Sequence, residues 1–401
     1  MIPTRAALAL PALLVLAGCG AVSAVTLRTT TNSVAGPDAP PHVVRLGGTP
    51  APAAPTPSPT APTSPAPPPL VTHVVATVAI GAGKEWLEIL TSSGSVVART
   101  EIDPMLAWMI AAGPGGAYWA ENGIEHELTT SGAVRSLGSV PSDATGVVIS
   151  PDGTAYAYVT AAQAQSGSIT NRIVVVRPGR APAVIADRVS DPNHPTADAP
   201  ASWTYYLITW KAAGIAFARV PSGGCGCGSF DMQMQSAYSA IVDPATRHVT
   251  TLTADNSCPL SNVGPDLETV CFASGSAATD AIHIGSGGTV THSYSLSGAN
   301  VAGDAVFAPS GTSLAYVTIP VGEDTCGATL TPTLRVLNIA TGGAVSRNVG
   351  DFTPLVWAPG GPIYGQMVNA SATWLAAVDP ATLAVTRLTP NATGIELVGV
   401  M

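Results

Sequence analysis

Two kinds of β-hairpin alternate along this chain, and the alternation limits the folds that it can form. The first kind is clearest at Val147–Val159, where apolar strands flank a tight turn. Pro151 suits the first central position of a type I turn, Asp152 suits the second, and Gly153 suits the positive φ that follows. Such a turn joins antiparallel strands with a bulge. Similar turns lie at 113–116, 308–311 and 358–361, with degenerate versions at 211–214 and 264–267.

The second kind of hairpin is an apolar strand, a short polar turn and a strand rich in Val, Thr and Arg. Because the two kinds alternate, each repeating unit holds about four strands, and four-stranded repeats of about 40–50 residues are typical of propeller blades. We therefore predict an all-β fold with a single β-propeller of seven four-stranded blades. Six or eight blades are alternatives, since some repeats are degenerate. The seven copies are 89–100, 127–138, 174–187, 240–253, 283–295, 336–349 and 377–389.

Residues 1–18 have the features of a signal peptide. They contain one charged residue, and their apolar run at 6–17 is shorter than the roughly 20 residues that a membrane span needs. The segment ends in Leu16-Ala17-Gly18-Cys19, which resembles the bacterial lipobox. The resemblance implies lipidation of Cys19 and an extracytoplasmic protein anchored to the cell membrane. Ordinary secretion, with cleavage after Ala24, is the alternative.

The rest of the chain divides into a linker and a folded domain. Residues 19–70 are rich in Pro, Ala and Thr, which cannot bury a core, so we expect a disordered tether. Residues 71–401 comprise 331 residues, or about 47 for each of seven units. The lone terminal strand at 396–401 is predicted to be the innermost strand of the first blade. This arrangement would join the two ends of the domain and remove an open sheet edge.

The hairpins resemble the TolB-type, WD40-like propeller repeat, which has a Ser-Pro-Asp-Gly turn between inner strands. Ser150-Pro151-Asp152-Gly153 matches that turn fully, whereas 308–311 and 358–361 match it in part. Trp357 stands at the aromatic position typical before the turn. The resemblance implies a propeller over most of 71–401 and brings no catalytic residues, because such propellers serve unrelated functions.

Charge and motif content exclude several classes of function. The net charge is −9, and lysine occurs only at Lys84 and Lys211, which argues against a nucleic-acid partner. The chain has no Gly-X-Ser-X-Gly elbow, no His-Glu-X-X-His and no phosphate-binding glycine loop. We therefore predict no cofactor, no metal site and no catalytic residue, and we expect a monomer.

Long loops are expected on one face of the propeller. This elaborated face carries the links between second and third strands and the links between blades. Loops of this kind on a rigid scaffold often carry binding sites. The loop segments are 160–172, 187–202, 219–237, 253–259 and 319–333. Candidate ligand-binding residues near them are Trp203, Tyr205, Asp231, Glu323 and Asp324, although core packing is the preferred interpretation of the aromatic pair.

Five cysteines follow Cys19, and an extracytoplasmic location favours disulfides among them. Cys258 and Cys271 flank the turn at 264–267 almost symmetrically, so we predict that they pair. Cys326 is expected to pair with Cys225 or Cys227, which leaves one thiol over. A metal or redox site at Cys225-Gly226-Cys227 is a weaker alternative, because no histidine lies near it in sequence.

Two functions remain for such a domain. The preferred one is a binding or scaffold module for a protein or an envelope glycan, bound through the elaborated face. The alternative is a hydrolase with its active site at the channel mouth on that face. The sequence favours binding because no motif requires catalysis to explain it.

Overall fold

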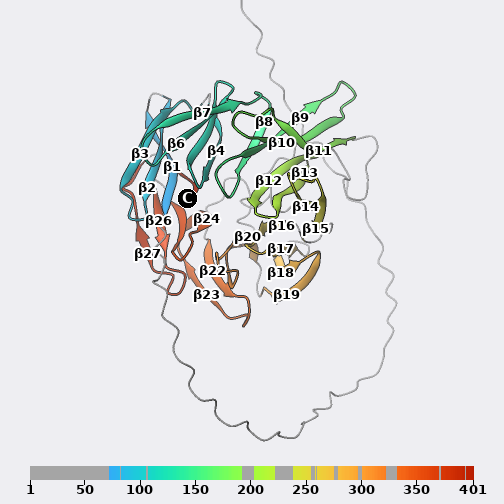
Figure 1. The fold of residues 1–401 in the computed structure, drawn as a ribbon. Helices are drawn as coiled ribbons and strands as arrows, with labels where there is room; N and C mark the ends of the chain where they lie inside the picture. The colour runs from blue at the N-terminus through green and yellow to red at the C-terminus, as the bar shows by residue number, and fades with distance from the viewer. Residues whose placement is uncertain are drawn as a thin grey trace, which may run out of the picture. The chain divides into compact units, whose positions relative to one another are not determined.

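The computed structural model consists of β-strands, turns and connecting segments (Figure 1). It describes residues 72–401 apart from 82, 105–106, 192–202, 222–237, 254–257, 259, 275–278, 297–299, 322–331, 370–371 and 393. The residues expected to form the signal peptide and the tether lie outside this range. Within the described part of the chain, no helix is long and apolar enough to cross a membrane.

In the described part of the chain, twenty-eight strands form seven four-stranded antiparallel sheets, which are the blades of a β-propeller. In order from the innermost strand outward, the first blade holds β28 (Ile395–Val400), β1 (His73–Gly81), β2 (Lys84–Thr91) and β3 (Val96–Ile102). The second holds β4 (Ala107–Gly113), β5 (Gly116–Glu121), β6 (Ile124–Thr129) and β7 (Val134–Ser139). The third holds β8 (Ala144–Ile149), β9 (Tyr156–Gln163), β10 (Ile169–Val176) and β11 (Ala183–Ser190).

The remaining four blades follow the same order. The fourth holds β12 (Trp203–Lys211), β13 (Gly214–Pro221), β14 (Tyr238–Val242) and β15 (Val249–Thr253). The fifth holds β16 (Leu260–Val263), β17 (Thr269–Ser274), β18 (Thr279–Ser286) and β19 (Thr289–Ser295). The sixth holds β20 (Asn300–Phe307), β21 (Ser313–Pro320), β22 (Thr333–Asn338) and β23 (Ala344–Asn348). The seventh holds β24 (Asp351–Trp357), β25 (Ile363–Asn369), β26 (Ala372–Val378) and β27 (Val385–Arg387).

The C-terminal strand closes the ring. β28 pairs with β1 in antiparallel register, with Val74 opposite Val400, and His73 and Met401 exchange two backbone hydrogen bonds of 3.1 and 3.0 Å. The innermost strands contact one another in sequence around the circle, from β28 through β4, β8, β12, β16, β20 and β24 back to β28. The predicted seven blades and the predicted closure by the last strand are therefore confirmed.

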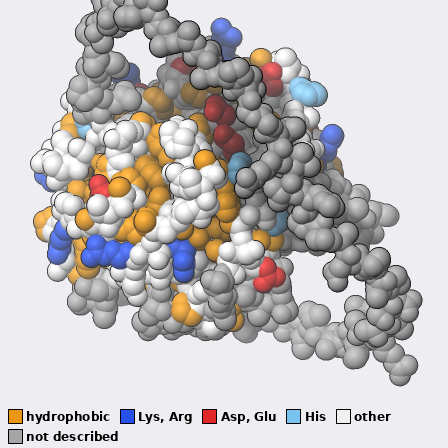
Figure 2. All heavy atoms as spheres, turned by 90° about the horizontal axis from the view of Figure 1, so that it is seen from below, with side chains coloured by type: hydrophobic (Ala, Val, Ile, Leu, Met, Phe, Trp, Pro, Cys, Tyr) orange, Lys and Arg blue, Asp and Glu red, His pale blue; other side chains and the backbone are white. Residues whose placement is uncertain are grey.

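The core lies between neighbouring blades. Seven clusters of buried hydrophobic residues each span one of the seven blade interfaces. Successive residues of a strand point to opposite faces, so Val74 packs toward the seventh blade while Val75 packs toward the second. Burial on both faces explains why second strands such as β5 and β21 are almost continuously buried rather than alternating. Valines such as Val96 and Val345 are exposed on outer strands. Figure 2 shows hydrophobic side chains exposed on the face that it draws.

The turn that best matches the repeat owes its shape to side-chain hydrogen bonds. Ser150 Oγ donates to Asp152 Oδ1 at 2.6 Å, and the same oxygen accepts from the backbone N–H of Thr154 at 3.0 Å. The N–H of Gly153, whose φ is +69°, donates to the carbonyl of Ser150 at 2.8 Å. A residue with a Cβ rarely adopts that φ, which explains the glycine.

Each innermost strand carries a β-bulge or register shift where it pairs with its neighbour. In β4, β8 and β20 the bulge contains a residue with positive φ, namely Met109, Gly146 and Asp304. A bulge adds one unpaired residue and increases the local twist. These bulges could not be predicted from the sequence, because the bulged residues share no residue type.

Cys258 and Cys271 are joined by a disulfide whose Cα atoms lie 5.2 Å apart, the pairing that the sequence predicts. The bond links residues 13 positions apart across the β16–β17 hairpin. A loop of this length is expected to stabilise the fold by about 2–3 kcal/mol, by restricting the unfolded chain. We therefore expect the double variant Cys258→Ser/Cys271→Ser to lose stability of this size in urea unfolding. Adding a reducing agent should then weaken the wild type more than the double variant.

Candidate binding pocket between the third and fourth blades

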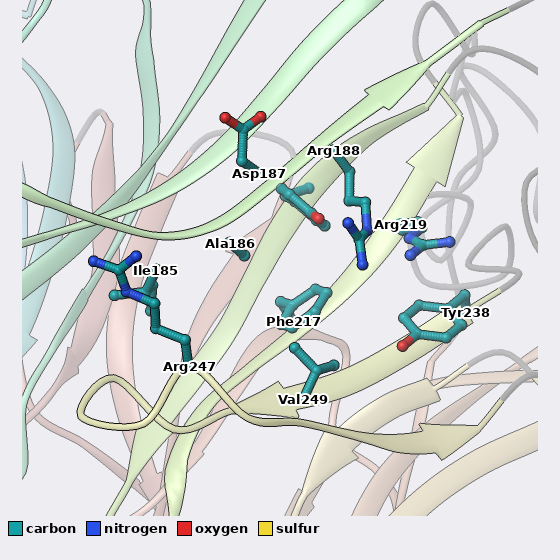
Figure 3. A pocket seen from close by; sticks show the side chains of 10 residues that line it. Ile185, Ala186, Asp187, Arg188, Phe217, Arg219, Tyr238, Arg247 and Val249 are labelled. Atoms are coloured by element: carbon teal, nitrogen blue, oxygen red, sulfur yellow. The ribbon is translucent and has the colours of Figure 1, made fainter.

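A pocket of about 240 Å³ opens between the outer parts of the third and fourth blades (Figure 3). Its walls come from β11 on one side and from β12, β13, β14 and β15 on the other. Three arginines and two tyrosines give it a polar, positively charged lining. The lining residues are Ile185, Ala186, Asp187, Arg188, Tyr205, Phe217, Arg219, Tyr238, Arg247 and Val249.

Arg219 lies between two aromatic rings. Its guanidinium carbon is 4.7 Å from the ring centroid of Trp203 and 4.0 Å from that of Tyr238. Trp203 is 6% exposed, and its carbonyl accepts a hydrogen bond of 2.9 Å from Asn171 Nδ2 in β10. The two rings hold the guanidinium in place through cation–π contacts. Trp203 therefore holds Arg219 in position without lining the pocket itself.

Tyr205 forms part of the pocket wall. Its ring meets Phe217 edge-on, with centroids 5.0 Å apart, and only 4% of the residue is exposed. Burial raises the pKa of Tyr205 to about 12, although Arg219 and Arg188 act in the opposite direction. The hydroxyl therefore keeps its proton at neutral pH and can donate a hydrogen bond to a ligand.

Arg188 and Arg247 are exposed, and the described residues offer neither guanidinium an ion pair or hydrogen bond. The nearby carboxylate of Asp187 is already paired, with Arg172 Nε 3.3 Å from its Oδ2. The pocket therefore contains more positive than negative charge.

A rigid turn between β14 and β15 presents Arg247. Asp243 Oδ1 accepts from the N–H of Ala245 at 2.8 Å, and Asp243 Oδ2 accepts from Thr246 Oγ1 at 2.7 Å. The Arg247 N–H donates to the Asp243 carbonyl at 2.8 Å, with φ of Arg247 at +61°. These bonds fix the backbone from which the arginine side chain extends.

The pocket runs along the blade interface from one face of the propeller toward the other. Arg188 and Arg219 lie near the ends of β11 and β13, at the elaborated face, and Arg247 lies in the β14–β15 turn at the opposite face. Figure 3 shows Arg188 and Arg219 close to each other, with Arg247 at the other end beyond Phe217. Such an arrangement suits a ligand that carries negative charge at two places.

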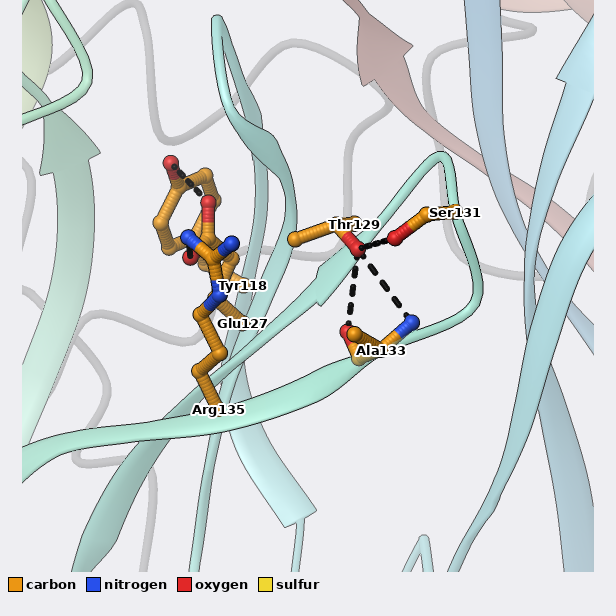
Figure 4. A network of polar contacts seen from close by, with 6 residues as sticks. All are labelled: Tyr118, Glu127, Thr129, Ser131, Ala133 and Arg135. Carbon is orange, nitrogen blue, oxygen red and sulfur yellow. Dashed lines mark hydrogen bonds and ion pairs between the residues drawn. The ribbon is translucent and has the colours of Figure 1, made fainter.

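A second polar cluster lies between the second and third blades (Figure 4). Tyr118 Oη donates to Glu127 Oε1 at 3.2 Å, and Arg135 Nη1 is 3.7 Å from Glu127 Oε2. Glu125, two residues earlier on β6, is fully buried, and neither of its carboxyl oxygens has a hydrogen-bond partner among the described residues. Burial raises the pKa of the Glu125 carboxyl to about 8. Tyr118, Glu125 and Glu127 are buried, whereas the Arg135 side chain is exposed at the edge of the cluster.

The sequence-predicted binding residues have different outcomes. Trp203 and Tyr205 both lie at this pocket, but Trp203 is packed in the blade interface and is not exposed at the channel mouth. Asp231, Glu323 and Asp324 lie outside the described residues. The same holds for Cys19 and for the proposed partners Cys225, Cys227 and Cys326. The described part of the chain contains no group of three His, Cys, Asp or Glu side chains that could hold a metal.

Sequence reasoning missed Arg188, Arg219 and Arg247. Each is an isolated basic residue on a different strand or turn, and they are brought together only by blade packing. The position of the expected loops gave one indication, since Arg219 is the first residue of the loop segment 219–237 on the elaborated face.

Comparisons with known proteins bear on the fold. No protein-family model matches the chain, and no match is found among curated proteins. An oligogalacturonate lyase from Vibrio parahaemolyticus has a TM-score of 0.51 at 13% identity, with 80% of this chain and 87% of that chain covered. A putative TolB from Agrobacterium tumefaciens has a TM-score of 0.42 at 14% identity, with 69% and 88% covered. TolB from Acinetobacter baumannii has a TM-score of 0.43 at 10% identity, with 82% and 83% covered. TolB-type propellers are thus among the structural neighbours, and the likeness to the lyase concerns the fold alone.

Proposed function

We propose that this chain is an extracytoplasmic binding module, anchored to the cell membrane through a lipid on Cys19. Its propeller binds a protein or a glycan of the envelope at the pocket between the third and fourth blades. The observation that carries the proposal is the pocket itself, where Arg188 and Arg247 have no acidic partner among the described residues. Unpaired guanidinium groups at an open pocket are available to a ligand.

Two further observations support a binding role. The wall that carries Arg219 is stiffened by the rings of Trp203 and Tyr238, which reduces the side-chain entropy lost on binding. The groups at the pocket are hydrogen-bond donors at neutral pH: guanidinium groups, and the Tyr205 hydroxyl with its raised pKa. The one carboxylate in the lining, Asp187, is paired with Arg172, so the pocket is better suited to recognise a charged group than to supply a general base.

The test is capture of envelope material by the whole chain and by two variants. The pocket variant Arg188→Ala/Arg247→Ala removes both exposed guanidinium groups. A matched control, Arg180→Ala, removes an exposed arginine from the β10–β11 turn, outside the pocket. Since a hydrogen bond to a charged group contributes about 1.5–3 kcal/mol, the pocket variant should bind its main partner at least about tenfold more weakly.

The outcomes separate the possible functions. Equal capture by the wild type and the pocket variant would show that the partner binds elsewhere. Release of cleaved products from the captured material would favour the hydrolase instead. If the Arg180→Ala control also lost capture, binding would depend on the positive charge of the surface in general and not on the pocket.

A further inference from the structure

The turn that carries Arg247 occurs a second time in this propeller. Residues 243–247 and 379–383 share the sequence Asp-Pro-Ala-Thr before their fifth residue, which is Arg247 in one case and Leu383 in the other. Asp379 Oδ1 accepts from the N–H of Ala381 at 3.0 Å, as Asp243 Oδ1 does from the N–H of Ala245. The fifth residue has positive φ in both turns, +61° and +54°. Arg247 and Leu383 therefore occupy equivalent positions.

The two equivalent residues do different things. Leu383 is 2% exposed and belongs to the hydrophobic cluster between the sixth and seventh blades. Arg247 is exposed and lines the pocket between the third and fourth blades. The same backbone thus fills one blade interface with a leucine and places a cation at the other. This internal comparison shows that the turn can hold a packing residue, so the arginine is not required by the turn.

The two ends of the pocket are both positively charged. Arg188 and Arg219 form one end, Arg247 forms the other, and the buried ring of Phe217 lies between them (Figure 3). Asp187 is the one carboxylate among the lining residues, and it is paired with Arg172 at 3.3 Å. A ligand with a single acidic group satisfies one end only.

The surface that the pocket exposes is mostly polar: Ile185 and Phe217 are buried, and Val249 is the one large apolar lining residue that is exposed. A ligand that fits this surface is mostly hydrophilic, which favours a sugar backbone over a peptide with apolar side chains. The Tyr205 hydroxyl and the arginine N–H groups are donors that match sugar and acid oxygens.

We propose that the pocket binds an acidic glycan through two oxyanion groups, one at Arg188 and Arg219 and the other at Arg247. This inference rests on the proposed function and specifies its ligand. The oxyanions are carboxylates or phosphates, which the test separates. Arg247 is then the residue that makes the pocket prefer a glycan with repeated acidic groups to a ligand with a single acidic group.

The test uses calorimetric titration of the whole chain with five probes. A uronic acid hexamer carries carboxylates, a hexamer of sugars joined by phosphodiesters carries phosphates, and a neutral glucose hexamer carries neither. A glutamate hexapeptide represents an acidic peptide, and inorganic phosphate represents a single anion. We expect one of the two acidic glycan-type polymers to bind, with affinity that falls as salt is raised, and we expect the neutral hexamer not to bind.

The decisive variant is Arg247→Leu, which gives the fourth blade the residue that its equivalent turn in the seventh blade already holds. This variant should fold as the wild type does, because Leu383 shows that the turn accepts leucine. It should weaken binding of the acidic polymer at least about tenfold, as loss of a charge-assisted contact implies. It should weaken the binding of inorganic phosphate much less, because a single anion can still bind at Arg188 and Arg219. Arg180→Ala should alter neither.

Several results would overturn the inference. They are unchanged polymer binding by Arg247→Leu, equal binding of the neutral hexamer, and tighter binding of the glutamate peptide than of either acidic polymer. The proposed function fails separately, when the Arg188→Ala/Arg247→Ala variant captures envelope material as well as the wild type. If capture depends on the pocket but none of the acidic polymers binds, the function stands and the acidic glycan is wrong.

Discussion

Removal of residues 395–401 is expected to abolish the closed propeller. β28 supplies the innermost strand of the first blade, and its Ile395 and Leu397 side chains are buried against the seventh blade. Deleting two such side chains would remove about 2–5 kcal/mol each, and the edge of β1 would lose its partner. The total is comparable to the whole stability of a typical domain, about 5–15 kcal/mol. We expect an aggregated or unfolded product by size-exclusion chromatography and circular dichroism.

Two point variants on the same strand provide the control. Leu397→Ser truncates a buried residue, whereas Glu396→Ser changes its exposed neighbour on the other face of β28. The first should lower the midpoint of thermal unfolding clearly, and the second should leave it almost unchanged. Addition of the peptide 395–401 to the deleted chain should restore part of the structure. A deleted chain that stays monomeric and melts as the wild type would show that ring closure does not depend on β28.

The closure of the ring could be predicted because the patterns that indicate it lie within short stretches of the sequence. Alternating hairpins give four strands per unit, and a strand without a partner at the end of the chain needs an open edge to pair with. The turns at 113–116, 211–214 and 308–311 do connect first and second strands, as the repeat requires. Even the degenerate turn at 264–267 takes this place, between β16 and β17.

The pocket could not be predicted in the same way, because its residues come together only when blades pack. Arg188 lies in β11 of the third blade, whereas Arg247 lies in the β14–β15 turn of the fourth blade. Neither residue forms a motif with its sequence neighbours. Of the two aromatic candidates, Tyr205 lines this pocket, whereas Trp203 is buried and contacts the Arg219 guanidinium. A residue-by-residue alignment of the repeats would have revealed Arg247 opposite Leu383.

The burial of Glu125 could not be predicted from the sequence either, because a glutamate on a strand is normally exposed to solvent. Its partners across the sheet are Ala120 and Gly138, which offer no polar side chain. A Cβ atom at Gly138 would lie 3.3 Å from Tyr156 Oη, and that hydroxyl also has no hydrogen-bond partner among the described residues. The carboxyl therefore stands in the apolar interface of the second and third blades beside a tyrosine.

We expect Glu125→Gln to stabilise the protein at alkaline pH. Burial raises the pKa of the Glu125 carboxyl from its ordinary value of 4.5 to about 8 in the folded state. The folded state therefore holds a proton that the unfolded state has lost, and the unfolding free energy of the wild type falls as the pH rises from about 4.5 to about 8. Because a tenfold change in proton affinity corresponds to about 1.4 kcal/mol, the loss above pH 8 is on the order of 4–5 kcal/mol. Glutamine has nearly the same shape and no proton to lose.

Urea unfolding at pH 5 and pH 9 measures this effect. At pH 5 the two proteins should differ little, since the wild-type carboxyl is protonated in the folded state. At pH 9 the Glu125→Gln variant should be the more stable by several kcal/mol. The matched control is Asp280→Asn, the same chemical change at an exposed strand residue, and it should follow the wild type at both values. A Glu125→Gln variant whose stability changes with pH as the wild type's does would place the charged carboxylate in contact with water or a cation. That result would mean that this blade interface is open to solvent.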